Sequence, residues 1–173
     1  MVLEEIFKKR EAVRNYLEKD VSEDLIKKIL KLASLSPSAG NLQARRVIIV
    51  KNPAIRKKLK VTCSGLGRFT IEPPVIFVIC SVPEESAIRY GDRGRNLYAL
   101  QDATIFASYL QLAAVSLGLA SCWVGSFDEN KVSEILNIPK NLVPVVMIPV
   151  GFSEEEPGEK SRKILAELVF KEI

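Results

Sequence analysis

Residues 98–125 read YALQDATIFASYLQLAAVSLGLASCWVG, and this stretch decides the fold of the chain. It overlaps a segment without charge that runs from residue 103 to residue 127. Apolar side chains on nearly all sides of a helix from 96 to 117 indicate burial, and Gly118 is a helix-stop signal. The segment is long enough to span a membrane, but polar side chains dilute it. We therefore predict a buried central helix followed by a buried strand over 119–124.

Capping and amphipathic signals predict further helices on both sides of this stretch. An amphipathic helix opens the chain and ends near Arg14. Ser22 is the expected N-cap of a second helix that stops before Pro37, because a residue that precedes proline avoids helical geometry. Asn52 and Asp128 are the expected N-caps of two more helices.

Apolar, β-branched runs predict the remaining strands. They cover 47–50, 75–81, 143–150 and, in a less regular pattern, 164–170. The polar, glycine-containing residues 84–95 predict a mobile excursion. Helices and strands are intermixed without a regular βαβ rhythm, and no GxGxxG motif follows a strand, which argues against a Rossmann nucleotide-binding fold.

Composition is typical of one folded domain. The chain has 173 residues, 47% hydrophobic and 27% charged, and we expect a single domain over residues 1–173. The formal net charge of +4 suits a phosphate-bearing ligand as well as nucleic acid. Basic residues are interleaved with acidic ones, and no basic motif contains interleaved aromatics, so we do not expect nucleic-acid binding.

The chain contains no histidine, which excludes Ser-His-Asp and Cys-His nucleophiles, HExxH metal sites and histidine acid–base catalysis. If the protein is an enzyme, a cofactor is expected to supply the chemistry. Three cysteines without CxxC spacing argue against a disulfide framework and against a metal site. Charged residues interrupt the N-terminal apolar positions, so no signal peptide is expected and the cytoplasm is the expected compartment.

Two segments in the first quarter of the chain are candidate ligand sites. Arg10 and Arg14, four residues apart on one predicted helical face, can converge on an anion such as phosphate, although an ordinary exposed basic face explains them too. Residues 36–43 combine small side chains with Asn41 and Gln43, whose amides can pair with the edge of a heterocycle. The alternative there is a plain helix-terminating loop.

Two further segments lie nearer the C-terminus. In residues 118–128 a strand ends in Gly125 beside a helix N-terminus, where backbone N–H groups can meet a ring nitrogen. Trp123 in this segment can equally be a core aromatic side chain. Residues 160–163 are basic and can be either a ligand contact or a solvated tail.

Together the four segments resemble the nitroreductase family of FMN-dependent oxidoreductases. The family motif RRSxRxF stands here as Arg10 to Tyr16, and PSxxNxQPW is matched from Pro37 to Gln43. The family's apolar helix and GLGSCWIG-type strand are paralleled by Tyr98 to Gly125, and its closing basic segment by Lys160 to Arg162. The resemblance runs in order over nearly the whole chain.

This resemblance implies a three-layer α+β fold with a mostly antiparallel central sheet, in a homodimer that exchanges its C-terminal strands and binds two FMN molecules at its interface. It implies that arginines and a lysine hold the FMN phosphate, that Arg14 approaches the pyrimidine side of the flavin, and that the Gly125 N–H points toward flavin N5. The residues expected to bind the cofactor are Arg10, Ala12, Arg14, Trp123, Val124, Gly125, Lys160 and Arg162, with Pro37, Ser38, Ala39 and Asn41 from the other subunit.

Three departures from the family pattern bear on the site. Glu11 and Ala12 replace arginine and serine, which brings a carboxylate near the phosphate and predicts weaker FMN binding. Ala44-Arg45 replaces the familiar Pro-Trp pair, which puts the substrate-side wall in question. Residues 84–95 are too few for the long helical excursion that covers the flavin in larger members.

The implied activity is hydride transfer from NADH or NADPH, through FMN, to a small acceptor such as a nitroaromatic or a quinone, in a ping-pong reaction. A second interpretation keeps the flavin but changes the chemistry to dehalogenation, flavin fragmentation or azoline oxidation. A third is a non-catalytic flavin-binding module.

Overall fold

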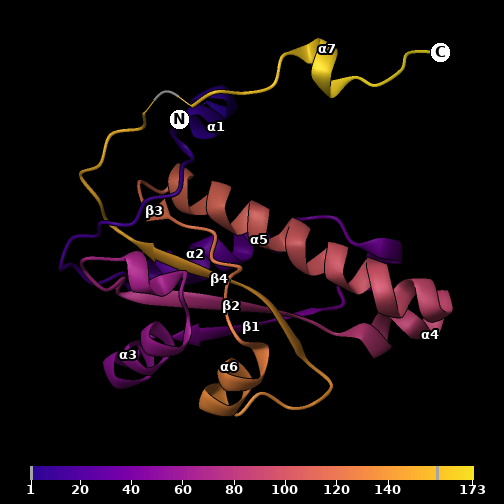
Figure 1. Cartoon of the computed structure of the whole chain (residues 1–173), viewed down its shortest axis with the longest axis horizontal. Helices are drawn as coiled ribbons and strands as arrows, with labels where there is room; N and C mark the ends of the chain where they lie inside the picture. The colour runs from indigo at the N-terminus through magenta and orange to yellow at the C-terminus, as the bar shows by residue number, and fades with distance from the viewer. Residues whose placement is uncertain (1, 159) are drawn as a thin grey trace.

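The structure, a computed structural model, describes residues 2–158 and 160–173. Within these residues four strands form one antiparallel sheet (Figure 1). In spatial order they are β1 (Arg45–Val50), β2 (Val75–Ser81), β4 (Val143–Gly151) and β3 (Ala120–Ser121). The strands β2 and β4 are central, which explains why the 75–81 and 143–150 runs contain so few polar residues.

Helices cover both faces of this sheet (Figure 1). On one face lie α2 (Glu23–Ala33) and α5 (Ala99–Ser116), and on the other lie α3 (Pro53–Thr62) and α6 (Glu129–Leu136). The three-layer α+β architecture expected from the resemblance is confirmed.

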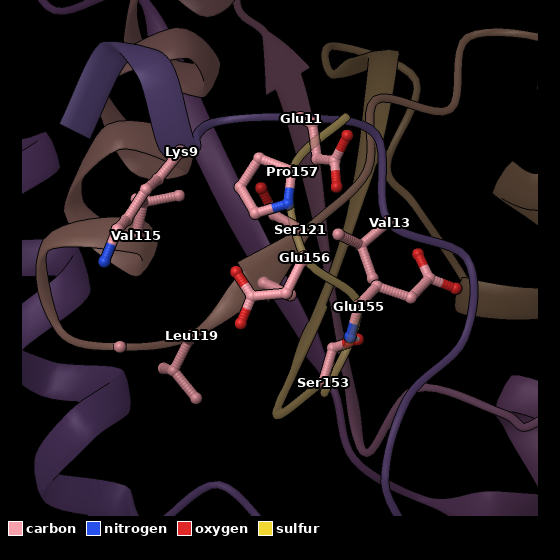
Figure 2. A pocket seen from close by; sticks show the side chains of 12 residues that line it. Lys9, Glu11, Val13, Val115, Leu119, Ser121, Ser153, Glu155, Glu156 and Pro157 are labelled. Atoms are coloured by element: carbon pink, nitrogen blue, oxygen red, sulfur yellow. Dashed lines mark hydrogen bonds between the residues drawn. The ribbon is translucent and has the colours of Figure 1, made fainter. Parts of the chain in front are cut away.

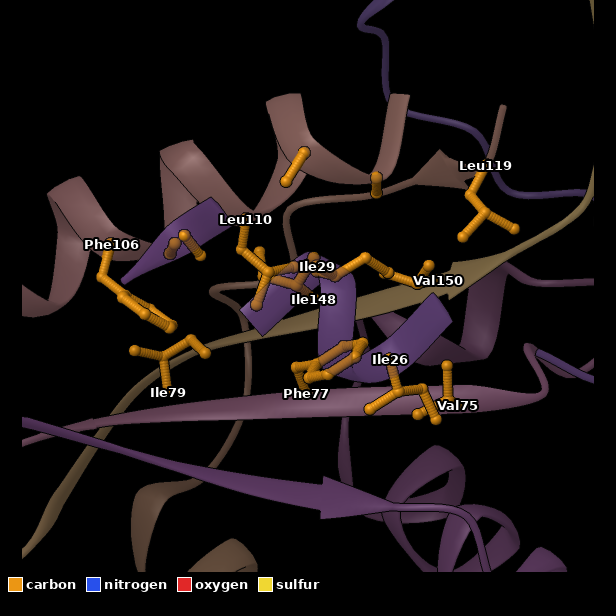
Figure 3. Packing of buried hydrophobic residues seen from close by; sticks show 14 of the residues in the cluster. Ile26, Ile29, Val75, Phe77, Ile79, Phe106, Leu110, Leu119, Ile148 and Val150 are labelled. Carbon is orange, nitrogen blue, oxygen red and sulfur yellow. The ribbon is translucent and has the colours of Figure 1, made fainter. Parts of the chain in front are cut away.

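The central strand β2 supplies both halves of the core, because successive side chains of a strand point to opposite faces. Phe77 and Ile79 belong to the cluster that α2 and α5 cover, where Figure 3 shows them beneath Phe106 and Leu110. Val78 belongs to the second cluster, under α3 and α6. All seven residues of β2 are buried, so the sheet is apolar on both sides.

The predicted N-caps are confirmed. The Ser22 hydroxyl accepts a hydrogen bond from the Leu25 N–H at 3.3 Å. Asn52 and Asp128 each accept one from the amide two residues further on, at 2.9 and 3.0 Å. These bonds satisfy N–H groups that have no partner inside their helices, which is why the capping residues mark the helix starts.

The charge-free stretch folds as predicted into α5, and Gly118 follows it with φ of 76°. A π-helical turn, η3 (Gly94–Tyr98), precedes α5. The strand expected over 119–124 is shorter: beyond β3 it continues only as a single bridge between Val124 and Met147. None of the described helices combines the length and the apolar character needed to cross a membrane.

Residues 84–95 do not form a mobile excursion, and that prediction is wrong. They lie in α4 (Pro83–Arg93) and in the first residues of η3. Pro83 occupies the first turn, and Glu84 in the same turn forms an ion pair with Arg95 at 2.8 Å. Proline and an acidic residue at a helix start are favourable, so the segment did carry a helix signal.

The first helix is also shorter than predicted, because α1 (Leu3–Lys9) ends well before Arg14. The Val13 N–H donates to the Ser121 carbonyl of β3 at 3.1 Å, so the chain after Lys9 runs beside the edge strand instead of continuing as a helix.

The strand predicted over 164–170 is wrong for the described chain. A short helix, α7 (Leu165–Leu168), lies there in a tail that leaves the body of the protein beyond α1 (Figure 1). A strand needs a paired edge, and within residues 2–158 and 160–173 no strand pairs with this tail. The apolar side chains of the tail are exposed, and Phe170 is fully so. Exchange of this segment between two subunits stays a prediction.

Candidate functional site

A basic depression of about 630 Å³ lies where the two ends of the chain meet. Arg10 lines it from the N-terminal side, and Lys160 and Arg162 line it from the C-terminal side. Lys8 and Lys9 line it as well, so residues separated by nearly the whole sequence place five cations around one open space, together with the carboxylates of Glu4, Glu11 and Glu156. Guanidinium and ammonium groups in such an arrangement suit a phosphate or another multivalent anion.

The predicted sharing of one helical face by Arg10 and Arg14 is wrong, because the chain between them is extended. Arg10 has φ of −67° and ψ of 112°. As a result Arg10 lines the basic depression, whereas Arg14 lines a separate, smaller one. The two arginines therefore do not converge on a single position.

Glu11 lies at the boundary between the basic depression and an acidic one of about 200 Å³. Figure 2 shows its carboxylate in the acidic depression with those of Glu155 and Glu156. Glu11 also forms an ion pair with Lys160, and its side chain is only 12% exposed. The Glu11 carboxylate therefore pairs with Lys160, a cation that the resemblance assigns to the FMN phosphate.

The smaller depression, about 130 Å³, lies at the end of the edge strand. Arg14, Arg68 and Trp123 line it together with Gly125. Trp123 is 39% exposed and is therefore not a core side chain. Val124 is 3% exposed and packs in the core beneath the depression.

Backbone pairing stops where this depression begins. The Val124 N–H donates to the Met147 carbonyl at 3.0 Å. Among the described residues, the N–H of Gly125 has no hydrogen-bond partner. The strand end thus presents one free donor in a depression that also holds two guanidinium groups.

The thiol of Cys122 at the strand end lies in the electrostatic field of nearby arginines. Burial raises the pKa of its thiol, and the positive charges of Arg14, Arg10 and Arg68 oppose that increase. All three arginines are therefore close enough to act on one buried atom. A negative charge that develops near the strand end would be stabilised by the same field.

Sequence reasoning missed the segment that carries Arg68. The turn η2 (Leu66–Arg68) is tied to the strand end, because the Gly65 N–H donates to the Ser126 carbonyl at 3.3 Å and the Ser64 and Ser126 hydroxyls are 2.9 Å apart. No motif points to the Gly65-Leu66-Gly67 stretch before Arg68. Its one available signal was a cation directly after two glycines.

The loop with the amide side chains lies elsewhere in the chain. Its 3₁₀ turn, η1 (Ala39–Asn41), is bound to Asp102 near the start of α5, since the Ala39 N–H donates to that carboxylate at 2.8 Å. Gln111, further along α5, donates to the Ser121 hydroxyl at 3.2 Å. Ser121 precedes Cys122, on which the charges of Arg10, Arg14 and Arg68 act, and these three residues are called the arginine cluster.

A helix rises 1.5 Å per residue, so Asp102, which holds the loop, and Gln111, which contacts Ser121, lie about 14 Å apart along α5. Within one chain, therefore, the loop and the arginine cluster do not share a depression. The loop residues thus separated are Pro37, Ser38, Ala39 and Asn41.

Arg45 does not form a substrate-side wall in this chain. Its side chain is 7% exposed, its Nη2 donates to the Ser36 carbonyl at 3.3 Å, and its guanidinium lies 5.0 Å from the centre of the Phe106 ring. The departure from the family pattern at this position therefore changes the interior of the protein.

Two helical layers on an antiparallel sheet, with arginines gathered at the end of its edge strand, define an α+β protein with a candidate anion-binding site. The pattern of the nitroreductase family matches residues 7–66 and 63–152. The chain belongs to the nitroreductase family.

Individual relatives agree with this assignment. A Methanothermobacter thermautotrophicus protein, provisionally named NADH dehydrogenase/NAD(P)H nitroreductase, is 32% identical over 160 residues, which cover 90% of this chain and 80% of that protein. A nitroreductase family protein of Clostridium difficile 630 has a crystal structure with a TM-score of 0.86 and 29% identity, covering 100% of this chain and 99% of its own. An FMN-dependent nitroreductase of C. difficile R20291 gives a TM-score of 0.75 at 27% identity, covering 97% and 95%.

Proposed function

We propose that this chain is an NAD(P)H-dependent oxidoreductase that binds FMN between two copies of itself and passes hydride to a small acceptor. The observation that carries the proposal is the meeting of Arg10, Lys160 and Arg162 in one depression, next to the strand end that holds Arg14 and Gly125. The names of the relatives, which include FMN and NAD(P)H, support the same class of enzyme.

The residues present fit the FMN phosphate. The depression of about 630 Å³ is within the usual range of ligand pockets, and five cations from the two chain ends line it against three carboxylates. Arg10 and Arg162 would hold the phosphate, Lys160 would assist once released from Glu11, and the backbone of Ala12 would contribute beside them.

The strand end offers polar contacts that suit the isoalloxazine ring, in a depression of about 130 Å³ that is smaller than a usual ligand pocket and would need further walls from a second copy. Arg14 and Arg68 would place positive charge at the pyrimidine side, where negative charge develops on reduction, and the free Gly125 N–H would donate to N5. Trp123 would form an aromatic wall. Bound FMN would supply the redox chemistry, accepting hydride from NADH or NADPH and returning it to an acceptor such as a nitroaromatic or a quinone.

A second copy of the chain would complete the site. In one copy the loop with Ser38 and Asn41 is held at Asp102, whereas the arginine cluster lies beyond Gln111 on the same helix, and α1 and the tail expose apolar side chains such as Phe7 and Phe170. Apolar surfaces of this kind mark protein–protein contacts. Replacing Phe170 and Ile173 by serine is expected to shift sedimentation from dimer toward monomer and to release FMN.

We place the enzyme in the cytoplasm. Cys63, Cys80 and Cys122 are all free and buried, which is compatible with a reducing compartment.

The test begins with the visible spectrum of the purified protein, with and without added FMN. A yellow protein whose bound flavin is bleached anaerobically by NADH or NADPH, and reoxidised by a nitroaromatic or a quinone, is expected. A colourless protein that does not retain added FMN refutes the proposal. Bound flavin that neither nucleotide bleaches refutes the reaction but leaves the cofactor.

A further inference from the structure

The loop from Ser36 to Arg45 has a backbone shape that needs support. Gly40, Asn41 and Gln43 all have positive φ, of 55°, 57° and 52°. Non-glycine residues adopt this region rarely, and such strained residues cluster at ligand-binding segments. Since Asn41 and Gln43 are exposed, the loop presents two amide side chains to solvent from a backbone held in an uncommon conformation.

A buried carboxylate holds this loop from behind. Asp102 on α5 is 1% exposed. One of its oxygens accepts the Ala39 N–H at 2.8 Å and the other accepts the Ala44 N–H at 3.4 Å. These donors lie on opposite sides of the left-handed residues, so a single side chain fixes both ends of the strained turn.

Arg45 holds the loop at a second point. It is buried, and it donates from Nη2 to the carbonyl of Ser36, where the loop begins. Burial lowers the pKa of the Arg45 guanidinium, and the charge of Asp102 opposes this effect. The charge of Asp102 thus offsets only part of the cost of burying the guanidinium, whose Nη1 has no hydrogen-bond partner among the described residues.

The outer side of the loop is packed as well. A side-chain carbon built on Gly40 would lie 2.5 Å from the Tyr90 hydroxyl and 2.8 Å from Nη1 of Arg89, both on α4. The loop is therefore confined between α4 and the Asp102 carboxylate. Pro37 and Gly40 remain exposed beside the amide side chains of Asn41 and Gln43.

We propose that Asp102 and Arg45 are positioning residues that pre-form the loop Ser36–Arg45 for the flavin ring. This inference rests on the proposed function, because it assumes that the loop contacts FMN in the partner's site. A loop that is ordered before binding loses less conformational entropy when the ligand arrives, which strengthens binding without a new contact. Neither residue touches the cofactor itself.

The main experiment compares Asp102→Asn and Asp102→Ala with the wild type by hydrogen exchange and by equilibrium dialysis against FMN. Asparagine keeps one acceptor oxygen but presents N–H groups to the second donor. We expect the amides of residues 37–45 to exchange about tenfold faster and FMN to bind about tenfold more weakly in Asp102→Asn, with larger effects in Asp102→Ala.

Leu110→Ala is the matched control. Leu110 lies on the same helix, is fully buried and packs in the cluster between α5 and the sheet. Its truncation should lower the melting temperature without selectively increasing exchange in residues 37–45 or weakening FMN binding. If Leu110→Ala and Asp102→Asn change loop exchange and FMN affinity in proportion to their loss of stability, the positioning role is refuted.

Two more variants test the same role in case the Asp102 variants do not fold. Ala39→Pro removes the donor instead of the acceptor, and Ser38, with φ of −149° and ψ of 157°, already has the geometry that a residue before proline requires. Arg45→Lys keeps the positive charge but replaces the guanidinium group whose Nη2 donates to the Ser36 carbonyl. Both should repeat the faster loop exchange and the weaker FMN binding, and wild-type values in both would overturn the inference.

The proposed function and this inference fail in different ways. If wild-type protein does not retain FMN, the proposed function is wrong. If wild-type protein retains FMN and the Asp102 variants retain it equally well, only the positioning role is wrong.

Discussion

Removal of the Glu11 carboxylate should tighten FMN binding. Glu11 lines the basic depression, forms an ion pair with Lys160 and is 12% exposed, whereas Lys160 is 42% exposed. In Glu11→Gln, Lys160 becomes available to the phosphate and one negative charge disappears from its surroundings. The variant is therefore expected to gain affinity for the cofactor at a small cost in the stability of the free protein.

The magnitude follows from the exposure of the two partners. A hydrogen bond to a charged group contributes about 1.5–3 kcal/mol, and exposure of Lys160 reduces this to about 1 kcal/mol. That free energy corresponds to an FMN Kd about fivefold lower. Loss of the ion pair should reduce the free energy of unfolding without FMN by no more than about 1 kcal/mol.

The chain supplies its own probe for this experiment, because Trp123 is the one tryptophan of the sequence and lies in the smaller depression. Quenching of its fluorescence during FMN titrations gives the Kd at low and at high salt, and screening should diminish the gain. Glu134→Gln, which removes an exposed carboxylate from α6, is the control for net charge. Unchanged or weaker binding in Glu11→Gln, or an equal gain in Glu134→Gln, would refute the reasoning.

Three further predictions concern the ring site, the packing and the response to pH. Arg14→Ala should weaken FMN retention and slow flavin reduction by NAD(P)H, because a charge near the reduced ring is lost; stopped-flow absorbance measures both, and wild-type values would show that Arg14 is misplaced. Gly151→Ala should lower the free energy of unfolding by about 1–3 kcal/mol, since its new carbon would lie 2.7 Å from Pro74 and 2.8 Å from Tyr16; a urea midpoint equal to that of the wild type would contradict this. Burial raises the pKa of Cys80 from 9.0 to about 11, so the thiol ionises first in the unfolded chain and the free energy of unfolding should fall as the pH rises from 9 to 11. Cys80→Ala should make that fall shallower in urea titrations at several pH values, and equal slopes would argue against it.

Local signals in the sequence determined many of the elements. Ser22, Asn52 and Asp128 mark helix starts because each cap satisfies amides of its own first turn, and no distant residue is needed. The apolar run 75–81 became the central strand because nothing but a buried position suits seven such residues. The charge-free run before Gly118 became α5 for the same reason.

The errors occur where a distant partner overrides a local preference. The helix expected to reach Arg14 ends at Lys9 because Val13 pairs with the edge strand, far along the chain. The 84–95 segment is a different case, because Pro83 and Glu84 in its first turn are a local helix signal that the polar, glycine-containing composition obscures. The tail predicted as a strand has no sheet edge beside it in the described chain, so its apolar pattern alone did not make it a strand.

The candidate site shows the same division. The sequence identified the basic residues at both chain ends and the glycine at the strand end, since their types and order were visible as motifs. It did not indicate Arg68, and it did not show that Asp102 holds the loop before Ala44, because hydrogen bonds between residues about sixty positions apart leave no local pattern.

By itself, then, the sequence determined the elements, the buried faces and the kinds of charge available, all of which depend on neighbours within a few turns of the chain. Only the tertiary structure decided that Arg10 meets Arg162, that Glu11 takes Lys160, and that the amide-bearing loop lies at the far end of α5. Those outcomes depend on how the sheet brings distant segments together, and burial and pairing across the sheet set them.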